Sequence, residues 1–512
     1  MGMKTKVALI SLYSTDAIGL RYLNAVLSAH GYDVSLIFFK ELHLSADMLT
    51  PPTQREYGLL LDLLRNIGPD LVGISLRSSF TGIASSITQQ IRKEGPIPVV
   101  WGGTHPTVAP EESIRIADMI CIGEGEYPFL ELLQAISSSG DYTRVSNLWV
   151  RRGEEIARND VRSLITDLDS LPFPEYGAEG KYLIEDERLS PGDPALATYN
   201  LNIMASRGCP YHCSYCCNSV FNALHHGKGP RIRRRTVGNV MTEILTLLER
   251  FPRVKRIDFI DEVFAWDKEW TAAFIERYRK EVNLPFQCAQ HPNIVDRDVL
   301  RMLRDAGLER VEIGVQSGSE RIRKQYLERP VSDQQLILTS ELLKEIGLVP
   351  FYDFIIDNPY ETDTERKETL DFLLKMRRPF HLHVFALKYF PGTVITRKAL
   401  EAGLISATQV EGNGTDMFRR MFVTLKDERP AADRFWVALY SLVSKSFVPK
   451  SLIRLLARSG TLKRHPGALV FFAELANKAK LGLIAFAWLF EGKPVLSMIR
   501  ATARRRGASP IV

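Results

Sequence analysis

The chain has 512 residues, 45% of them hydrophobic and 25% charged, which indicates a globular protein of two or three domains. Six cysteines in this length exclude a disulfide framework and suit a reducing compartment. The net charge of +6 is uneven, because the stretch from Lys445 to the C-terminus carries 13 Lys or Arg against two acidic residues. The rest is mildly acidic, so the charge gives no argument for a nucleic-acid partner, and none is expected.

The N-terminal segment, Met1 to Lys6, leads directly into an apolar strand-like stretch. It has no long apolar run followed by a cleavage site, so no secretory signal is expected there. Together with the cysteine usage, this predicts a cytoplasmic protein.

Residues 1–140 alternate apolar strands with helix-length segments, one of which runs from Leu20 to His30. This alternation predicts an α/β domain with a doubly wound, Rossmann-like parallel sheet, whose ligands bind beyond the carboxyl ends of the strands. The five expected strands are 7–10, 34–39, 71–75, 98–101 and 119–122.

Two glycine-containing loops follow the last two of these strands. The first begins with Trp101, Gly102 and Gly103 and continues to His105; the second is Gly123-Glu124-Gly125-Glu126. Glycine lets backbone amides approach a large ligand closely, so both loops are candidate binding segments.

Residues 141–195 are expected to be a linker. Residues 148–156 predict a small hairpin, and the proline-punctuated stretch 167–174 predicts an extended segment. The strand–helix alternation then resumes from 196 to 400.

Six strand–helix units in residues 196–400 predict a partial (β/α)6 barrel, with its catalytic groups at the carboxyl ends of the strands. The expected strands are 201–205, 256–260, 285–290, 310–315, 350–356 and 382–389. The expected helices include 238–251, 267–280, 297–305, 333–346 and 363–376.

A C-x3-C-x2-C run follows the first of these strands. Cys209, Cys213 and Cys216 could hold three irons of a 4Fe–4S cluster and leave the fourth iron open to a small molecule. With Cys217 or His212 as a fourth ligand, the run could instead bind zinc.

The cysteine run, with an aromatic residue before its last cysteine, resembles that of the radical S-adenosylmethionine (SAM) superfamily. The loops of residues 101–106 and 123–126 resemble the W-G-G-x-H-P and G-E-G-E motifs of the cobalamin-binding domain that precedes many radical SAM domains. The resemblance implies that the open iron chelates SAM and that SAM is cleaved to a 5′-deoxyadenosyl radical. It also implies that residues 1–140 bind cobalamin, through Trp101, Gly102, Gly103, His105, Gly123, Glu124, Gly125 and Glu126.

One cobalamin motif is missing. Other cobalamin domains carry D-x-H-x-x-G, whose histidine ligates cobalt, whereas here Asp16-Ala17-Ile18-Gly19 occupies the first loop. A histidine below the cobalt is therefore not expected from this motif.

The same resemblance assigns SAM contacts in residues 196–400, namely Asp261, Glu262, Gln316, Ser317 and Glu320. The family usually has G-x-P-[GE]-E-T after its fifth strand. Here Asp357 replaces the glycine and Tyr360 a small residue, which weakens the expected adenine contact. Cys288 is expected to pack in the core.

Residues 401–512 are expected to be helical and match no known motif. Residues 481–490 are strongly apolar but too short to span a bilayer. Two alternatives remain: a helical lid on the barrel mouth, or an interfacial helix on an anionic membrane, helped by Arg504, Arg505 and Arg506.

The expected function is that of a cobalamin-dependent radical SAM enzyme with three cofactors: a 4Fe–4S cluster, SAM and cobalamin. It would methylate an unactivated carbon of a small-molecule or lipid substrate through a 5′-deoxyadenosyl radical and methylcobalamin, with electrons from a ferredoxin or flavodoxin. The alternatives are a radical rearrangement or cyclisation with non-methylating cobalamin, and a non-catalytic iron–sulfur or zinc-binding protein. A tRNA methylthiotransferase is disfavoured, because residues 1–140 offer only Cys121 for a second cluster.

Overall fold

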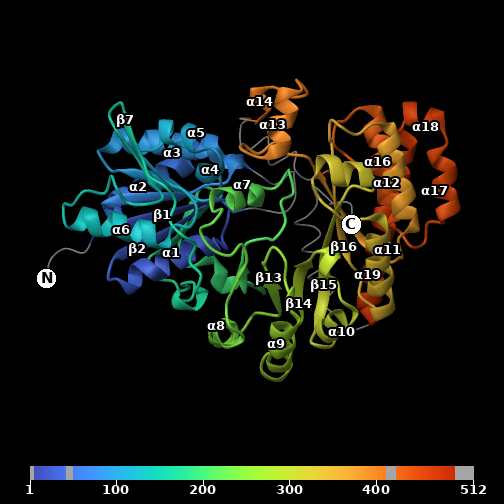
Figure 1. The fold of residues 1–512 in the computed structure, drawn as a ribbon, viewed down its shortest axis with the longest axis horizontal. Coiled ribbons are helices and arrows are strands. Elements are labelled where there is room, and N and C mark those ends of the chain that lie inside the picture. Colours follow the sequence, from blue (N-terminus) through green and yellow to red (C-terminus); the bar gives the residue numbers. More distant parts are fainter. Residues whose placement is uncertain (1–4, 42–49, 411–422, 491–512) are drawn as a thin grey trace. The chain divides into compact units, whose positions relative to one another are not determined.

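The computed structural model describes residues 5–41, 50–410 and 423–490, with side chains as far as residue 479. The chain forms two compact units. Within the described residues, the first unit holds 5–41, 50–261 and 389–410, and the second holds 262–388 and 423–490. Figure 1 labels the elements of both.

The first unit is built on a nine-stranded sheet in the order β7-β6-β5-β4-β3-β1-β2-β8-β9. Its five central strands pair in parallel and confirm the predicted doubly wound sheet. They are β1 (Lys6–Leu12), β2 (Asp33–Phe39), β3 (Leu71–Ser75), β4 (Val99–Gly102) and β5 (Met119–Cys121).

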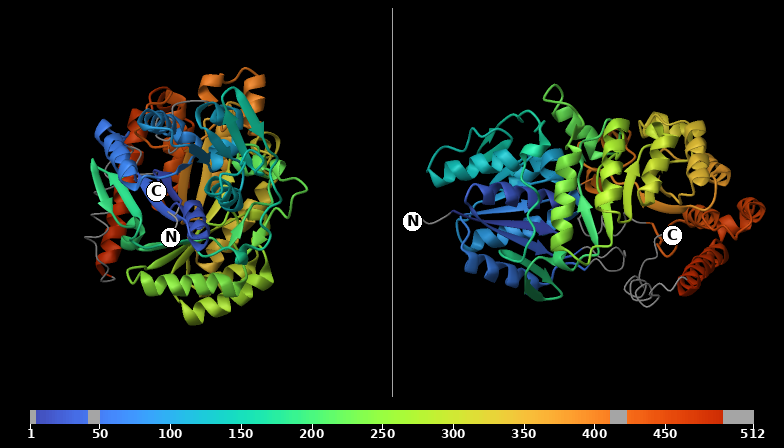
Figure 2. Two further views of the ribbon diagram at one scale, coloured as in Figure 1. Left: turned by 90° about the vertical axis from the view of Figure 1, so that its left-hand side faces the viewer. Right: turned by 90° about the horizontal axis from the view of Figure 1, so that it is seen from below.

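Helices cover both faces of this sheet, as the blue part of Figure 2 shows. Helices α1 (Ile18–Ala29) and α6 (Glu126–Ser137) pack side by side over a core of large aliphatic residues from the central strands. Helices α2 (Gln54–Ile67) and α3 (Thr81–Glu94) pack against each other on the opposite face. Two short helices, α4 (Thr104–Val108) and α5 (Pro110–Ile116), fill the connection from β4 to β5.

The segment expected to be a linker contributes two antiparallel hairpins that extend the sheet at both edges. The predicted hairpin, β6 (Leu148–Arg152) and β7 (Glu155–Arg158), pairs with β5. A second one, β8 (Lys181–Glu185) and β9 (Arg188–Pro191), pairs with β2. The sequence did not reveal the second hairpin because its turn residues, Asp186 and Glu187, have φ angles of +49° and +58° without the usual Gly or Asn.

The later strands form a six-stranded parallel sheet whose order follows the chain, β10-β13-β14-β15-β16-β17. Helices alternate with these strands, so the predicted partial (β/α)6 barrel is confirmed. The strands are β10 (Asn200–Ile203), β13 (Arg256–Phe259), β14 (Phe286–Gln290), β15 (Leu308–Gln316), β16 (Phe351–Ile356) and β17 (His381–Ala386). The helices between them are α8 (Val237–Arg250), α9 (Lys268–Glu281), α10 (Arg297–Asp305), α11 (Asp333–Ile346) and α12 (Asp363–Lys375).

Within the first unit, a short antiparallel pair, β11 (Ser206–Arg207) and β12 (Arg233–Arg234), precedes and follows the cysteine run. Helix α7 (Cys217–Leu224) begins directly after that run and packs on α4. Helix α13 (Val394–Glu401) starts against the same loop, where the amide of Ile395 donates to the carbonyl of Ser214 at 3.0 Å.

The tail is helical, as expected. In the second unit α16 (Ala431–Val443) packs against α12, and α17 (Lys450–Ala457), α18 (Gly460–Arg464) and α19 (Gly467–Phe490) pack on α16. Among the described helices, none is both long and apolar enough to cross a membrane. The side chains of 481–490, and all of Arg504, Arg505 and Arg506, lie outside the described residues.

Candidate cofactor sites

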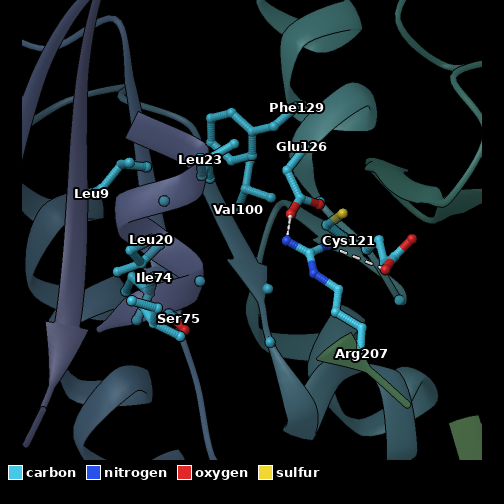
Figure 3. A pocket seen from close by; sticks show the side chains of 18 of the residues that line it. Leu9, Leu20, Leu23, Ile74, Ser75, Val100, Cys121, Glu126, Phe129 and Arg207 are labelled. Carbon is cyan, nitrogen blue, oxygen red and sulfur yellow. Dashed lines mark hydrogen bonds and ion pairs between the residues drawn. The ribbon is translucent and has the colours of Figure 1, made fainter. Parts of the chain in front are cut away.

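A cavity of about 240 Å³ lies in the first unit, at the carboxyl ends of the central parallel strands (Figure 3). Its walls come from strands β1, β3, β4 and β5, from helices α1 and α6, and from the loop between β5 and α6. We call it the slot. Its lining is mostly apolar, with glycines at several positions: Leu9, Ile18, Gly19, Leu20, Leu23, Gly73, Ile74, Ser75, Val100, Gly102, Gly103, Cys121, Gly123, Glu124, Gly125, Glu126, Phe129, Met204 and Arg207.

Both predicted glycine loops therefore reach one cavity, but not with every residue expected there. Val100 faces the slot, whereas Trp101 is fully buried on the other face of the sheet and donates through Nε1 to Oγ1 of Thr88 in α3 at 2.9 Å. Because side chains alternate along a strand, Val100 and Trp101 cannot share a face. The Trp101 side chain thus belongs to the core of the unit and not to the lining of the slot.

His105 is also placed away from the slot lining. It is 2% exposed, and its Nδ1 lies 3.0 Å from Oγ of Ser78. Burial lowers its pKa to about 4, so the ring is neutral near pH 7. Thr107, two residues later, ties the two glycine loops together: its Oγ1 donates to the carbonyl of Gly103 (2.9 Å) and accepts from the amide of Gly123 (3.0 Å).

The segment that replaces the D-x-H-x-x-G motif also meets the slot. Ile18 and Gly19, at the start of α1, line it, and no histidine is among the described residues that do so. At Gly19 an added Cβ would meet no protein atom within 4 Å. Glycine here leaves open space beside the cavity.

The two carboxylates of the second glycine loop are held by arginines that the sequence analysis missed. Glu126 lies 2.7 Å from Nη2 of Arg207 (Figure 3). Glu124 lies 3.2 Å from Nη1 of Arg207 and 2.6 Å from Nη1 of Arg233. Burial would raise the pKa of Glu124, but the guanidinium groups of Arg207 and Arg233 hold it below its usual value. Both glutamates are thus ion-pair partners of arginine in the wall of the slot.

The cysteine run forms a loop between β11 and α7. Cys209 and Cys216 are partly exposed, Cys213 is buried, and the amide of Cys216 donates to the carbonyl of Cys213 at 3.1 Å. Nδ2 of Asn222 donates to the carbonyls of Cys209 (3.1 Å) and Tyr211 (3.2 Å), which fixes the loop from the helix that follows.

Gly208 is required by this geometry. Its φ is +97°, and a Cβ there would lie 1.8 Å from the carbonyl oxygen of Arg231, so only glycine fits. Within the described residues, no three His, Cys, Asp or Glu side chains converge as ligands of a single metal ion. A 4Fe–4S cluster does not need that convergence, because each of its cysteines binds a different iron.

Asp261 and Glu262, expected to contact SAM, differ in their surroundings. Asp261 is 4% exposed; it accepts from the amide of Ala205 at 3.0 Å and from the hydroxyl of Ser206. Burial raises its pKa to about 6. Asp261 thus fixes the strand that leads into the cysteine run, whereas Glu262 is exposed.

In the second unit, the expected SAM-binding run follows β15. Gln316 has a φ of +74°, at an irregularity in the pairing of β15 with β16. Ser317 is 1% exposed and donates to Oε1 of Glu361 at 2.9 Å. Burial raises the pKa of Glu361 to about 7, although the bond from Ser317 opposes this. The sequence analysis did not single out Glu361.

Glu320 is held at the start of α11. Its Oε2 accepts from the amide of Asp333 at 2.9 Å, and its Oε1 pairs with Nζ of Lys324 at 2.6 Å. This carboxylate is therefore engaged within the protein and caps a helix. A SAM contact from Glu320 would therefore use the remaining acceptor positions of its carboxylate.

Asp357 stands where the family usually has glycine, and it keeps a glycine-like backbone. Its φ is +62°, in the left-handed region, and its carboxylate pairs with Arg429 of the tail.

Two other residues are structural. Cys288 is 2% exposed on β14, as expected of a packing residue, and Gly392 (φ +75°) brings its turn against the carbonyl of Val108.

Comparisons with known proteins match two stretches of the chain to family models. Residues 6–133 match the model of the B12 binding domain, and residues 203–373 match that of the radical SAM superfamily. The chain therefore belongs to the radical SAM enzymes that carry a cobalamin-binding domain. This confirms the predicted family and the three cofactor classes.

Two curated relatives and one solved structure illustrate the similarity. An uncharacterised methyltransferase of Pyrococcus horikoshii is 28% identical over 67% of this chain and 72% of its own length. An anaerobic magnesium-protoporphyrin IX monomethyl ester cyclase of Synechocystis is 26% identical over 60% of this chain and 58% of its own length. The radical SAM methyltransferase TsrM of Kitasatospora setae, solved with cobalamin and a [4Fe-4S] cluster, shares the fold with a TM-score of 0.64 and 15% identity, covering 93% of this chain and all of that one.

Proposed function

We propose that this enzyme methylates an unactivated carbon of a small-molecule or lipid substrate. When bound, cobalamin supplies a transferable methyl group, and SAM at the cluster supplies the radical that activates the substrate carbon. The observation that carries the proposal is the slot. It is lined by both glycine loops and by Arg207, which lies two residues before Cys209 in the same compact unit. The methyltransferases among the similar proteins support methyl transfer as the reaction.

The residues around the slot fit part of a large, flat cofactor. Gly19, Gly102 and Gly125 remove side chains from its wall, and Leu9, Val100 and Phe129 are among its apolar lining residues. A cavity of about 240 Å³ holds only part of cobalamin, so the rest of the cofactor lies outside it. Trp101 and His105 would support the loops from behind rather than contact the cofactor.

Cys209, Cys213 and Cys216 would each bind one iron of the cluster, on a loop shaped by Gly208 and fixed by Asn222. Asp261 would order the entry to this loop through Ala205 and Ser206. In the second unit, the positive φ of Gln316 and the buried hydroxyl of Ser317 shape the turn proposed to contact SAM. Glu262 and Glu320 remain weaker candidates for that contact, because the first is exposed and the second caps α11.

The test of the proposal is cofactor loading followed by turnover of SAM alone. Anaerobically reconstituted protein should hold about four irons per chain, bind cobalamin stoichiometrically and, with a reductant, release 5′-deoxyadenosine. Reduced ferredoxin and reduced flavodoxin are the electron donors to compare with a chemical reductant. Protein that binds cobalamin but never cleaves SAM would contradict the proposal.

A second candidate is radical ring formation with cobalamin that does not donate a methyl group. The similarity to a cyclase favours it. The two candidates differ in one product: methylation consumes two SAM per turnover and leaves a methyl group on the substrate, whereas cyclisation leaves none.

We also propose that the tail contacts an anionic membrane surface. Helix α19 buries Leu469, Val470, Ala473 and Ala476 in the second unit but exposes Phe471 (68%) and Leu475 (53%). From 450 to 479 the chain carries six Lys or Arg and one acidic residue, Glu474. Exposed aromatic and aliphatic residues next to basic ones are typical of helices that lie in a membrane interface. Such docking would favour a lipid substrate.

Flotation with anionic liposomes tests this contact. We expect the full chain to float at low salt, and less as salt screens the basic residues. Replacing Phe471 and Leu475 by Ser should abolish flotation, whereas Leu338→Ser, which alters a leucine on α11 that is 46% exposed, should not. If the full chain does not float at any salt concentration, membrane contact is contradicted and the helical lid is the remaining interpretation of the tail.

A further inference from the structure

Arg207 is the one cation among the described residues that line the slot, and it contacts three different elements of its wall. Its Nη2 lies 2.7 Å from Glu126 at the start of α6, and its Nη1 lies 3.2 Å from Glu124 in the loop after β5. Its guanidinium carbon lies 5.1 Å from the centre of the Tyr22 ring on α1. One side chain thus joins α1, the second glycine loop and α6.

The same residue belongs to the entry of the cysteine loop. Arg207 ends β11, Gly208 follows with its required positive φ, and Cys209 comes next. A shift of the Arg207 backbone would therefore reach the first cysteine, because only Gly208, which packs closely beside the carbonyl of Arg231, separates the two residues.

Ion pairs hold Arg207 in place between the slot and the cysteine loop. Arg207 and Arg233 lie directly opposite each other in the β11–β12 pair, and like charges in that position repel. Glu124 lies between them and binds both, and its Oε2 also accepts from the amide of Ile165 at 3.0 Å. Glu126 is only 7% exposed, so it needs Arg207 as its partner.

We propose that Arg207 is a positioning residue that couples the cobalamin site to the geometry of the cluster loop. The inference rests on the proposed cobalamin and cluster sites. Arg207 would hold the wall against which cobalamin binds, and its backbone would link that wall to Cys209. Loss of the side chain would weaken cobalamin binding and at the same time alter the environment of a cluster whose ligands are untouched.

The experiment compares anaerobically reconstituted full-length wild type with Arg207→Gln, Glu126→Gln and the double variant. Cobalamin affinity is measured by optical titration, and the cluster by its electron paramagnetic resonance spectrum with SAM bound. We expect Arg207→Gln to weaken cobalamin binding by about tenfold or more and to shift the spectrum, with iron content unchanged. The double variant should bind cobalamin no worse than Arg207→Gln alone, because the two side chains act as one pair.

Arg158→Gln is the control, because Arg158 makes a two-point contact with Glu111 (3.2 and 2.9 Å) in the same unit, and neither residue lines the slot. It should leave both measurements unchanged. Unchanged affinity and spectrum in Arg207→Gln, or equal changes in the control, would overturn the inference. If Arg207→Gln does not fold, Glu126→Gln tests the inference through the same measurements of cobalamin affinity and of the cluster spectrum. If the wild-type protein binds no cobalamin, the proposed function itself is contradicted.

Discussion

Nη1 of Arg429 lies 2.5 and 2.6 Å from the two carboxylate oxygens of Asp357. Asp357 directly follows β16 and has a left-handed backbone conformation. The tail is attached around this point by further bonds, from Trp436 to Asp363 (3.0 Å) and from Tyr440 to the carbonyl of Arg366 (2.8 Å). Asp357 thus gives the tail an anchor at the carboxyl end of a barrel strand.

Removing this anchor should loosen the tail. The Arg429 side chain is 11% exposed and that of Asp357 33%, so we expect Arg429→Gln to destabilise the docked tail by about 1 kcal/mol. Limited proteolysis should then cleave the chain beyond residue 423 sooner. Arg397→Gln, which breaks an exposed pair with Glu401, is the control. Identical cleavage of both variants would contradict the anchoring role.

Glu361 should make stability depend on pH. Its folded-state pKa, about 7, lies above the ordinary value of 4.5, so its contribution is complete below about pH 4.5 and is lost as pH rises through 7. Glu361→Gln keeps an acceptor for Ser317 but cannot ionise. Relative to this variant, wild type should lose at most about 3 kcal/mol between pH 5 and pH 8. Thermal midpoints at both values check this, and a constant difference between the two proteins would count against it.

Gly19 offers a clean test of the slot. It is the second residue of α1 and lines the cavity, and Gly82 is the second residue of α3 and does not. Neither glycine would place an added Cβ within 4 Å of another protein atom. We expect Gly19→Val to weaken cobalamin binding by about tenfold and Gly82→Val to leave it unchanged, as measured by optical titration. Equal affinities would exclude the slot as the site.

Other glycines of the slot are less suitable. Gly103 has a φ of +90°, and a Cβ there would lie 3.1 Å from the backbone of Leu76, so Gly103→Val would strain the fold itself. Gly125→Val meets only Sγ of Cys121, at an ordinary 3.7 Å, and is a second usable variant. It should resemble Gly19→Val.

The cysteine run should control all SAM chemistry. Replacing Cys209, Cys213 and Cys216 by Ala should abolish both the cluster and the formation of 5′-deoxyadenosine. Cys217→Ala is the control, and it should be mild because adjacent cysteines rarely both bind one cluster in this pattern. Iron analysis and chromatography of the nucleoside products check both. A fully active triple variant would refute the cluster assignment.

The fold could largely be predicted from the sequence where the apolar periodicity agrees with the glycines and prolines that end helices and strands. The predicted helix 333–346 coincides with α11, which ends where Gly347 adopts a φ of +83°. The predicted strand 71–75 coincides with β3. By contrast, β9 is exposed along its length and follows an atypical turn, so it carries neither signal.

The sites were predictable where a local motif carries the chemistry. Both glycine loops and the cysteine run are local, whereas Arg207 acts through partners about 80 residues earlier in the chain. Because side chains alternate along β4, the sequence could have shown that Val100 and Trp101 face opposite sides of the sheet. Nothing in the sequence pattern paired Ser317 with Glu361 or Asp357 with Arg429, because those contacts depend on tertiary packing.

The most direct test of methyl transfer needs no knowledge of the substrate. The reconstituted, cobalamin-loaded protein is reduced and incubated with SAM that carries a trideuterated methyl group, and the cobalamin is then extracted for mass spectrometry. The account predicts that the extracted cobalamin carries the trideuterated methyl group, and that Gly19→Val protein yields less of it. Cobalamin that stays unmethylated while 5′-deoxyadenosine accumulates would contradict methyl transfer and favour ring formation.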